Sequence, residues 1–254
     1  MYKSYSASDY RREFALPENY RVEGMLMWGG WNRQRKISVL QKSLAGRSAE
    51  FNNLPGFLER MIEFVLADKT YWFDVSYGGP RLCEYLHLAC LFGSQKNILL
   101  GTCGGLDPRA DACDFVIPTF SYGNESTTRV YQPEVSDHEH FPNKEMSARL
   151  ARAISSKHKV WQGPTVTNQA MMGETLEDVK RWSEKGYLGV EMEAATVFAV
   201  SNHFAVPSAA ILFVGDNLIR GETALDAAYK NARQLKETTE SEQYRVALAE
   251  LLGS

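Results

Sequence analysis

The chain has 254 residues, of which 44% are hydrophobic, enough for one large domain or two small ones with a substantial core. Its 28 basic and 31 acidic side chains nearly balance, giving a formal net charge of -3. This balance argues against nucleic acid or a membrane surface as a partner and favours a small molecule.

The cysteines and histidines indicate neither a disulfide framework nor a zinc site. Four cysteines form no CxxC pair, and five scattered histidines complete no zinc-ligand spacing. The first residues, MYKSYSASDYRREF, are polar where a secretory signal needs an apolar segment. We therefore expect a reduced, cytoplasmic protein that uses no metal and no organic cofactor.

The predicted elements alternate between strands and helices. Short apolar or β-branched runs predict strands at 24–30, 70–78, 97–102, 114–120, 187–192 and 207–216. Apolar residues at helical spacing predict helices at 80–93, 174–186, 193–204 and about 222–252. We expect a loose N-terminal arm at 1–22 and a single α/β domain at 23–254, with a central mixed or mostly parallel β-sheet flanked by helices. Ligands in such folds bind where strands end.

Three predicted strand ends carry polar or small residues. In LLGTCGGL (99–106), Gly101, Gly104 and Gly105 surround Thr102 and can form a cradle for an oxyanion, although an ordinary tight turn has the same composition. The strand AILFVGDN (210–217) leads into Asp216, which suits either proton transfer or a turn.

The third strand end, YLGVEMEAATV (187–197), places two glutamates in an apolar run. Ionised carboxylates are rarely buried without partners. Glu191 and Glu193 are therefore either a structural pair, bonded to backbone or arginine, or the polar wall of a ligand site.

These motifs resemble a known family when they are taken together. GTCGGL, VEMEAATVFAV and FVGDN, in this order and at this separation, resemble the nucleoside phosphorylase family of the uridine and hexameric purine nucleoside phosphorylase type, which also contains nucleosidases. The resemblance runs from about residue 70 to residue 235. It implies a nucleoside phosphorylase-like fold and a homo-oligomer, either a dimer or a trimer of dimers.

The resemblance also implies roles for individual residues. Glu193 would accept hydrogen bonds from the ribose 2′- and 3′-hydroxyls, Met192 would pack on the sugar, and Glu191 would lie nearby. Asp216 would protonate or hydrogen-bond N7 of a purine as the base departs, a role that uridine phosphorylases generally lack. The remaining matches are Thr102 and Gly101 at phosphate, Cys103 and Gly104 against base and sugar, and Lys230 near an arginine that assists the aspartate.

The residues expected to bind phosphate, here called the phosphate end of the site, depart from the family pattern. The family's GDPxR segment reads GGWNR (29–33) here, which keeps Arg33, and a second family arginine is replaced by Leu99. Arginine suits phosphate because its fork is bidentate and permanently charged. Possible substitutes are Arg35, Arg47, Arg60 and Arg81. Water is the rival nucleophile, but the glutamate that activates it in methylthioadenosine nucleosidases has no counterpart at this place.

The base pocket is also unusual. Met171 and Met172 stand where relatives carry an aromatic or charged residue, and a methionine pair can form a broad apolar pocket or simply a piece of core. Glu125 and Tyr131 are further candidates to line the site from a loop.

The sequence as a whole predicts a purine nucleoside phosphorylase-like enzyme. It would cleave a nucleoside with inorganic phosphate as co-substrate, giving free base and ribose 1-phosphate. The alternatives are a nucleosidase that uses water, a uridine phosphorylase, and a nucleoside-binding or storage protein without turnover.

Overall fold

The fold is built on one mixed β-sheet. The computed structural model describes residues 2–223 and 233–253. Ten strands lie in this part of the chain: β1 (Gly24–Gly29), β2 (Glu50–Asn53), β3 (Ile62–Leu66), β4 (Lys69–Ser76), β5 (Asn97–Gly105), β6 (Phe115–Asn124), β7 (Glu139–His140), β8 (Val160–Asn168), β9 (Gly189–Glu191) and β10 (Ser208–Asn217). They follow the order β10-β6-β8-β9-β5-β1-β4-β3-β2, with β7 beside β6.

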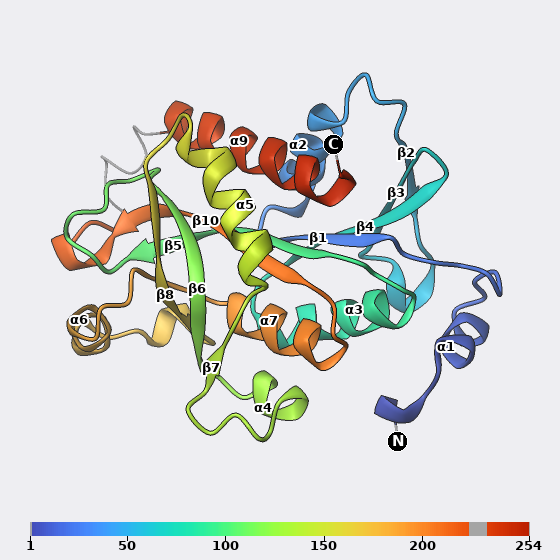
Figure 1. Cartoon of the computed structure of the whole chain (residues 1–254), viewed down its shortest axis with the longest axis horizontal. Coiled ribbons are helices and arrows are strands. Elements are labelled where there is room, and N and C mark those ends of the chain that lie inside the picture. Colours follow the sequence, from blue (N-terminus) through green and yellow to red (C-terminus); the bar gives the residue numbers. More distant parts are fainter. Residues whose placement is uncertain (1, 224–232, 254) are drawn as a thin grey trace.

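Helices cover both faces of this sheet (Figure 1). The α-helices of the described residues are α1 (Ala7–Glu13), α2 (Arg33–Ser43), α3 (Gly79–Leu91), α4 (Thr127–Tyr131), α5 (Lys144–Ser155), α6 (Leu176–Glu184), α7 (Ala194–His203) and α9 (Arg233–Leu252). Short 3₁₀ turns are η1 (Tyr2–Ser4), η2 (Gly56–Leu58), η3 (Met171–Gly173) and η4 (Leu218–Arg220). One apolar cluster lies under α2, α5 and α9, and another under α3 and α7. None of the described helices is both long and apolar enough to cross a membrane.

Strand β5 changes partners along its length, and this positions the site. Its first half pairs with β1 as far as Leu100, whereas Gly104 and Gly105 pair with β9. On its other side β5 pairs with β10, which closes the path β10-β6-β8-β9-β5 on itself. Between the end of β1 and the start of β9, residues 101–103 are paired with β10 alone among the described strands. Such a change of strand partner opens space for a ligand at the strand ends.

The six predicted strands and the first three predicted helices are present with small shifts in their bounds. The last predicted helix appears as α9, and Lys230 lies outside the described residues. Several elements were not predicted: β2, β3, β7, β8, α2, α4 and α5. Strand β2, for example, is a short edge strand that is mostly exposed, so its sequence has no apolar alternation to detect.

The N-terminal arm is docked, so its description as loose is wrong. Ser6 and Asp9 form a capping box that starts α1. Tyr10 and Phe14 then pack against the apolar cluster under α3 and α7. Further along, the Tyr20 hydroxyl accepts a hydrogen bond of 2.8 Å from the indole nitrogen of Trp72. Aromatic burial thus fixes a segment whose polar composition resembles a free terminus.

Candidate active site

The two glutamates of the VEMEAA segment have different surroundings. The Glu191 carboxylate accepts hydrogen bonds from the backbone N–H groups of Glu193 (2.7 Å) and Ala194 (2.6 Å), at the start of α7. It also accepts from the hydroxyls of Thr167 and Ser121, which lie on β8 and β6. With four donors around it, Glu191 caps the helix and ties three elements together.

Glu193 lies at the carboxyl ends of β1 and β4. Its Oε1 accepts a hydrogen bond of 2.7 Å from the backbone N–H of Gly78, and its Oε2 lies against Gly29. A Cβ atom at position 29 would stand 2.3 Å from Oε2, so only glycine leaves room for this carboxylate. Burial, followed by the charge of Glu191, raises the pKa of Glu193 to about 8. Half-buried Met192 completes the group, with its methyl carbon beside Gly78.

The glycine-rich end of β5 lies next to Glu193. Thr102 is exposed at the place where β5 has a strand on one side only, and Gly101 approaches the backbone of Gly29. The carbonyl of Gly101 accepts a hydrogen bond of 2.9 Å from the Gln243 side chain on α9. Gly29, Gly101 and Thr102 thus meet at one edge of the sheet.

The Cys103 thiol points away from this edge. It is buried in an apolar cluster with Val116, Leu212 and Val214, and burial raises its pKa far above the usual range. A thiol in this environment is inert as a nucleophile, so only the backbone of Cys103 can border the site. Gly104 is half-exposed, and Leu218 of η4 packs over it.

Asp216 lies at the end of β10, opposite Gly104 and directly after a β-bulge. It is half-buried, and its charge contributes to the raised pKa of Glu174, whose main cause is burial. Burial, and after it the charges of Glu193 and Glu174, raise the pKa of Tyr77. Asp216, Glu174, Tyr77 and Glu193 thus form one electrostatic group near the ends of β10, β9 and β4.

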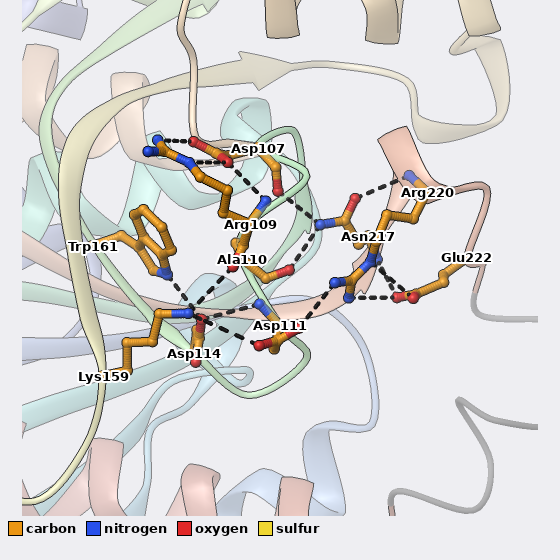
Figure 2. Close-up of polar contacts among 10 residues, drawn as sticks. All are labelled: Asp107, Arg109, Ala110, Asp111, Asp114, Lys159, Trp161, Asn217, Arg220 and Glu222. Carbon is orange, nitrogen blue, oxygen red and sulfur yellow. Dashed lines mark hydrogen bonds and ion pairs between the residues drawn. The ribbon is translucent and has the colours of Figure 1, made fainter.

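A polar network fixes the strand end that carries Asp216 (Figure 2). The buried side chain of Asn217 donates to the carbonyls of Asp107 and Ala110, both at 2.8 Å, and accepts from the Arg220 backbone. The Arg220 guanidinium pairs with Asp111 at 2.9 Å. The loop after β5 is thereby fastened to the residue that follows Asp216.

The phosphate end of the site differs from the sequence pattern of the family. Leu99 is fully buried in the apolar cluster under α3 and α7. Arg33 is the first residue of α2, and its Nε and Nη2 donate to the carbonyl of Arg60 at 3.3 and 2.9 Å. Arg35 pairs instead with Glu240 at 3.4 Å on α9, and Arg47 is exposed. Among the proposed substitutes, Arg60 and Arg81 thus lie near Arg33, whose pKa their charges lower in addition to the larger effect of burial.

Four loop candidates have other surroundings, although the carbonyl of Met171 accepts a hydrogen bond of 3.2 Å from the backbone N–H of Glu174. Met171 and Met172 belong to η3 and are 36% and 91% exposed. Glu125 is a turn residue, because its carboxylate accepts from the backbone N–H groups of Thr127 and Thr128. Tyr131 is buried, and its hydroxyl lies 3.2 Å from Nδ1 of His87.

Tyr77, Gly78 and Glu174 were missed by the sequence reasoning. The segment SYGGP that follows β4 has the same glycine-rich composition as GTCGG, and this signal could have identified the Gly78 turn. Tyr77 also pairs with Trp31, with ring centroids 5.1 Å apart, and both rings are exposed at the strand ends. In the described residues, no group of three or more His, Cys, Asp or Glu side chains is arranged to hold a metal ion.

Comparisons with known proteins agree with this architecture. The family model described as the phosphorylase superfamily matches residues 81–243. Guanosine phosphorylase of Halorubrum lacusprofundi is 30% identical over 133 residues, which span 51% of this chain and about half (53%) of that relative. A DeoD-type purine nucleoside phosphorylase of Clostridium beijerinckii is 27% identical over 73% of this chain and 89% of its own length.

A solved structure confirms the predicted fold class. The crystal structure of uridine phosphorylase from Vibrio fischeri superposes with a TM-score of 0.76 at 17% identity, covering 93% of this chain and 95% of that one. At this identity the likeness establishes the fold: a single α/β domain with a large mixed sheet.

Proposed function

The chain belongs to the phosphorylase superfamily, and from this premise we propose that it is a purine nucleoside phosphorylase. A phosphate oxygen would attack C1′ of the nucleoside as the N-glycosidic bond breaks. The products would be ribose 1-phosphate and the free base, which takes up one proton at N7. Phosphate is thus a co-substrate. The other groups in this scheme are side chains and backbone groups of the protein.

The observation that carries the proposal is the position of Glu193. It is buried at the end of β9, held through one oxygen by the Gly78 N–H, and turned toward Gly29 and the end of β5. A carboxylate offers two acceptor oxygens that suit a vicinal diol, so Glu193 would bind the ribose hydroxyls while Met192 packs on the sugar. Its negative charge would also stabilise positive charge that develops at C1′.

Asp216 favours a purine as the leaving base. Its carboxyl group lies at a strand end of the same electrostatic group as Glu193, and its neighbour Asn217 is fixed by buried hydrogen bonds. A carboxyl held in this way can donate a proton or a hydrogen bond to N7 as the base leaves. Two curated relatives, at 30% and 27% identity, carry guanosine and purine nucleoside names, which agrees with this choice.

The nucleophile end would be formed by Thr102, the backbone of Gly101, and Arg33. Thr102 is exposed at the unpaired side of β5, and its hydroxyl can donate to phosphate. Because Leu99 is buried where the family carries an arginine, hydrolysis by water is the second candidate function.

One experiment separates these functions. Purified protein is incubated with a panel of purine and pyrimidine nucleosides, with and without inorganic phosphate, and the release of free base is followed. We expect purine release that requires phosphate and is accompanied by an equal amount of ribose 1-phosphate.

Each other outcome identifies a rival. Base release of equal rate without phosphate would establish a nucleosidase. Release of uracil alone would establish a uridine phosphorylase. Tight nucleoside binding without release would establish a binding protein.

A further inference from the structure

Three arginines gather around one buried carboxyl group at the phosphate end. Arg33 donates to the carbonyl of Arg60 at 2.9 Å, and the charges of Arg60 and Arg81 both act on Arg33. The same two arginines act on Asp74, which lies on β4 and is 1% exposed. The group therefore combines three permanent positive charges with one carboxyl group.

Two helix N-termini point to the same edge. The parallel neighbours β1 and β4 lead directly into α2 and α3, so both helices begin at the carboxyl ends of these strands. Neither N-cap residue, Asn32 or Gly78, satisfies its helix with a side-chain hydrogen bond. The first backbone N–H groups of an uncapped helix attract anions, and the helix dipole adds to the attraction.

Buried polar atoms within this group have no hydrogen-bond partner in the described part of the chain. They are Oδ1 of Asp74 and Nε of Arg60. Oδ2 of Asp74, in contrast, accepts from the Ser76 hydroxyl. Buried polar atoms are normally satisfied, so Nε of Arg60 indicates a place for a water or an anion that accepts its hydrogen, whereas Oδ1 of Asp74 can accept only from a donor such as water.

The arginine group lies beside the proposed ribose site. Gly78, the N-cap of α3, donates its N–H to Glu193, and Arg81 follows in the first turn of the same helix. Ser76, which bonds Asp74, is the register partner of Gly29, against which Glu193 packs. An anion bound by the arginines would therefore be adjacent to the sugar.

We propose that Arg60 and Arg81 act with Arg33 as the phosphate-binding cations of this protein, in place of the family arginine that Leu99 replaces. Arg33 is the first residue of α2, and Arg81 lies in the first turn of α3. Arg60 lies between η2 and β3, with its carbonyl bonded to Arg33. The single carboxyl group of Asp74 can balance only one of the three positive charges, which leaves a net positive charge for the anion. This inference deepens the proposed function and rests on it for the identity of the ligand.

The test measures phosphate binding apart from turnover. Inorganic phosphate is titrated by calorimetry into the wild type, Arg60→Gln, Arg81→Gln, and the control Arg152→Gln, an exposed arginine on α5. We expect Arg60→Gln and Arg81→Gln to weaken phosphate about tenfold to a hundredfold each, since a charge-assisted hydrogen bond is lost. In turnover assays KM for phosphate should rise by a similar factor, whereas KM for the nucleoside and the control variant should stay at wild-type values.

The outcomes separate this inference from the proposed function. Turnover that needs phosphate, with unchanged phosphate affinity in both folded variants, overturns the arginine assignment and leaves phosphorolysis intact. Phosphate-independent turnover, with phosphate still bound through Arg60 and Arg81, keeps the site and overturns phosphorolysis. If a variant misfolds by circular dichroism, Arg60→Met and Arg81→Met provide the same comparison, because methionine keeps an unbranched side chain and removes the charge. For these substitutions, wild-type phosphate affinity overturns the assignment.

Discussion

Two glutamates separated by one residue have different roles because their donors differ. Glu191 is surrounded by four hydrogen-bond donors, two from the start of α7 and two from the neighbouring strands. Glu193 accepts from the Gly78 N–H through one oxygen, and its other oxygen lies against Gly29 at the end of β1. Of the two readings of VEMEAA, the structural one therefore describes Glu191, and the ligand-facing one is our proposal for Glu193.

The raised pKa of Glu193 predicts pH-dependent nucleoside binding. With a pKa of about 8, the free protein holds this carboxyl protonated at pH 6.5 and ionised above pH 8. Ribose hydroxyls donate better to the ionised form, so nucleoside affinity measured calorimetrically without phosphate should rise about tenfold between pH 6.5 and 8.5. Glu193→Gln should bind more weakly, with a flat profile.

The raised pKa of Glu193 also makes the free energy of unfolding depend on pH. The folded state holds the Glu193 proton up to a pKa of about 8, whereas the unfolded state releases it near the ordinary glutamate pKa of 4.5. The free energy of unfolding therefore falls as pH rises between these two values, and Glu193→Gln should remove this part of the fall. A pH-independent affinity in the wild type would contradict the assignment of Glu193 to the ribose.

We expect substitution of Asp216 to lower turnover and to leave nucleoside binding nearly unchanged. Asp216→Asn keeps the shape of the side chain and removes the transferable proton, so kcat should fall about a hundredfold to ten-thousandfold. The nucleoside KM should change little, since the ribose contacts remain. Glu174→Gln, at the neighbouring carboxyl group, is the matched control and should have the smaller effect. An unchanged kcat in Asp216→Asn would remove its role.

At the scale of elements, the site depends on close packing of helix starts. The first turns of α3 and α7 touch at Gly79, where an added Cβ atom would lie 2.2 Å from Oγ1 of Thr196. This contact lets the α3 N-cap, Gly78, reach Glu193 at the start of α7. A composition of Gly-Gly-Pro predicts a turn and a helix start, but not which helix the turn will meet.

Gly79→Ala should therefore destabilise the fold. Forcing a methyl group against the Thr196 side chain costs about 1–3 kcal/mol of unfolding free energy, measured by denaturant titration. Thr196→Ala should recover part of this loss in the double variant, because it removes Oγ1. Gly173→Ala is the control, since its nearest neighbour would lie at an ordinary 3.7 Å. Equal stability of Gly79→Ala and the wild type would show that the two helix starts are not tightly packed.

At the scale of the whole molecule, β5 brings the parts of the site together. Its pairing with β1, β9 and β10 places three strand ends around residues 101–105. These pairings join segments that lie far apart in the chain, and the Gln243 side chain of α9 ties β5 to β10 through the carbonyls of Gly101 and Ile211. The pairing of β5 with β10, which closes the sheet on itself, therefore brings the parts of the site together.

The exposed apolar side chains favour the predicted homo-oligomer. Met172 is 91% exposed, and Val130 and Leu176 are each 63% exposed, which suits burial against a second copy. Light scattering after size exclusion should give two or six times the 28.6 kDa mass of one chain. A single-chain mass at micromolar concentration would contradict this prediction.

The sequence by itself determined six of the ten described strands, four of the helices and the three strand-end motifs, because glycine turns, apolar runs and helix starts are local patterns. It also identified the family through GTCGGL, VEMEAATVFAV and FVGDN. Tertiary structure decided which glutamate is capped, that the Cys103 thiol faces the core, and that Arg60 and Arg81 lie beside Arg33. The physical reason is that the donors and charges around these groups come from distant segments of the chain, which only the tertiary fold brings together.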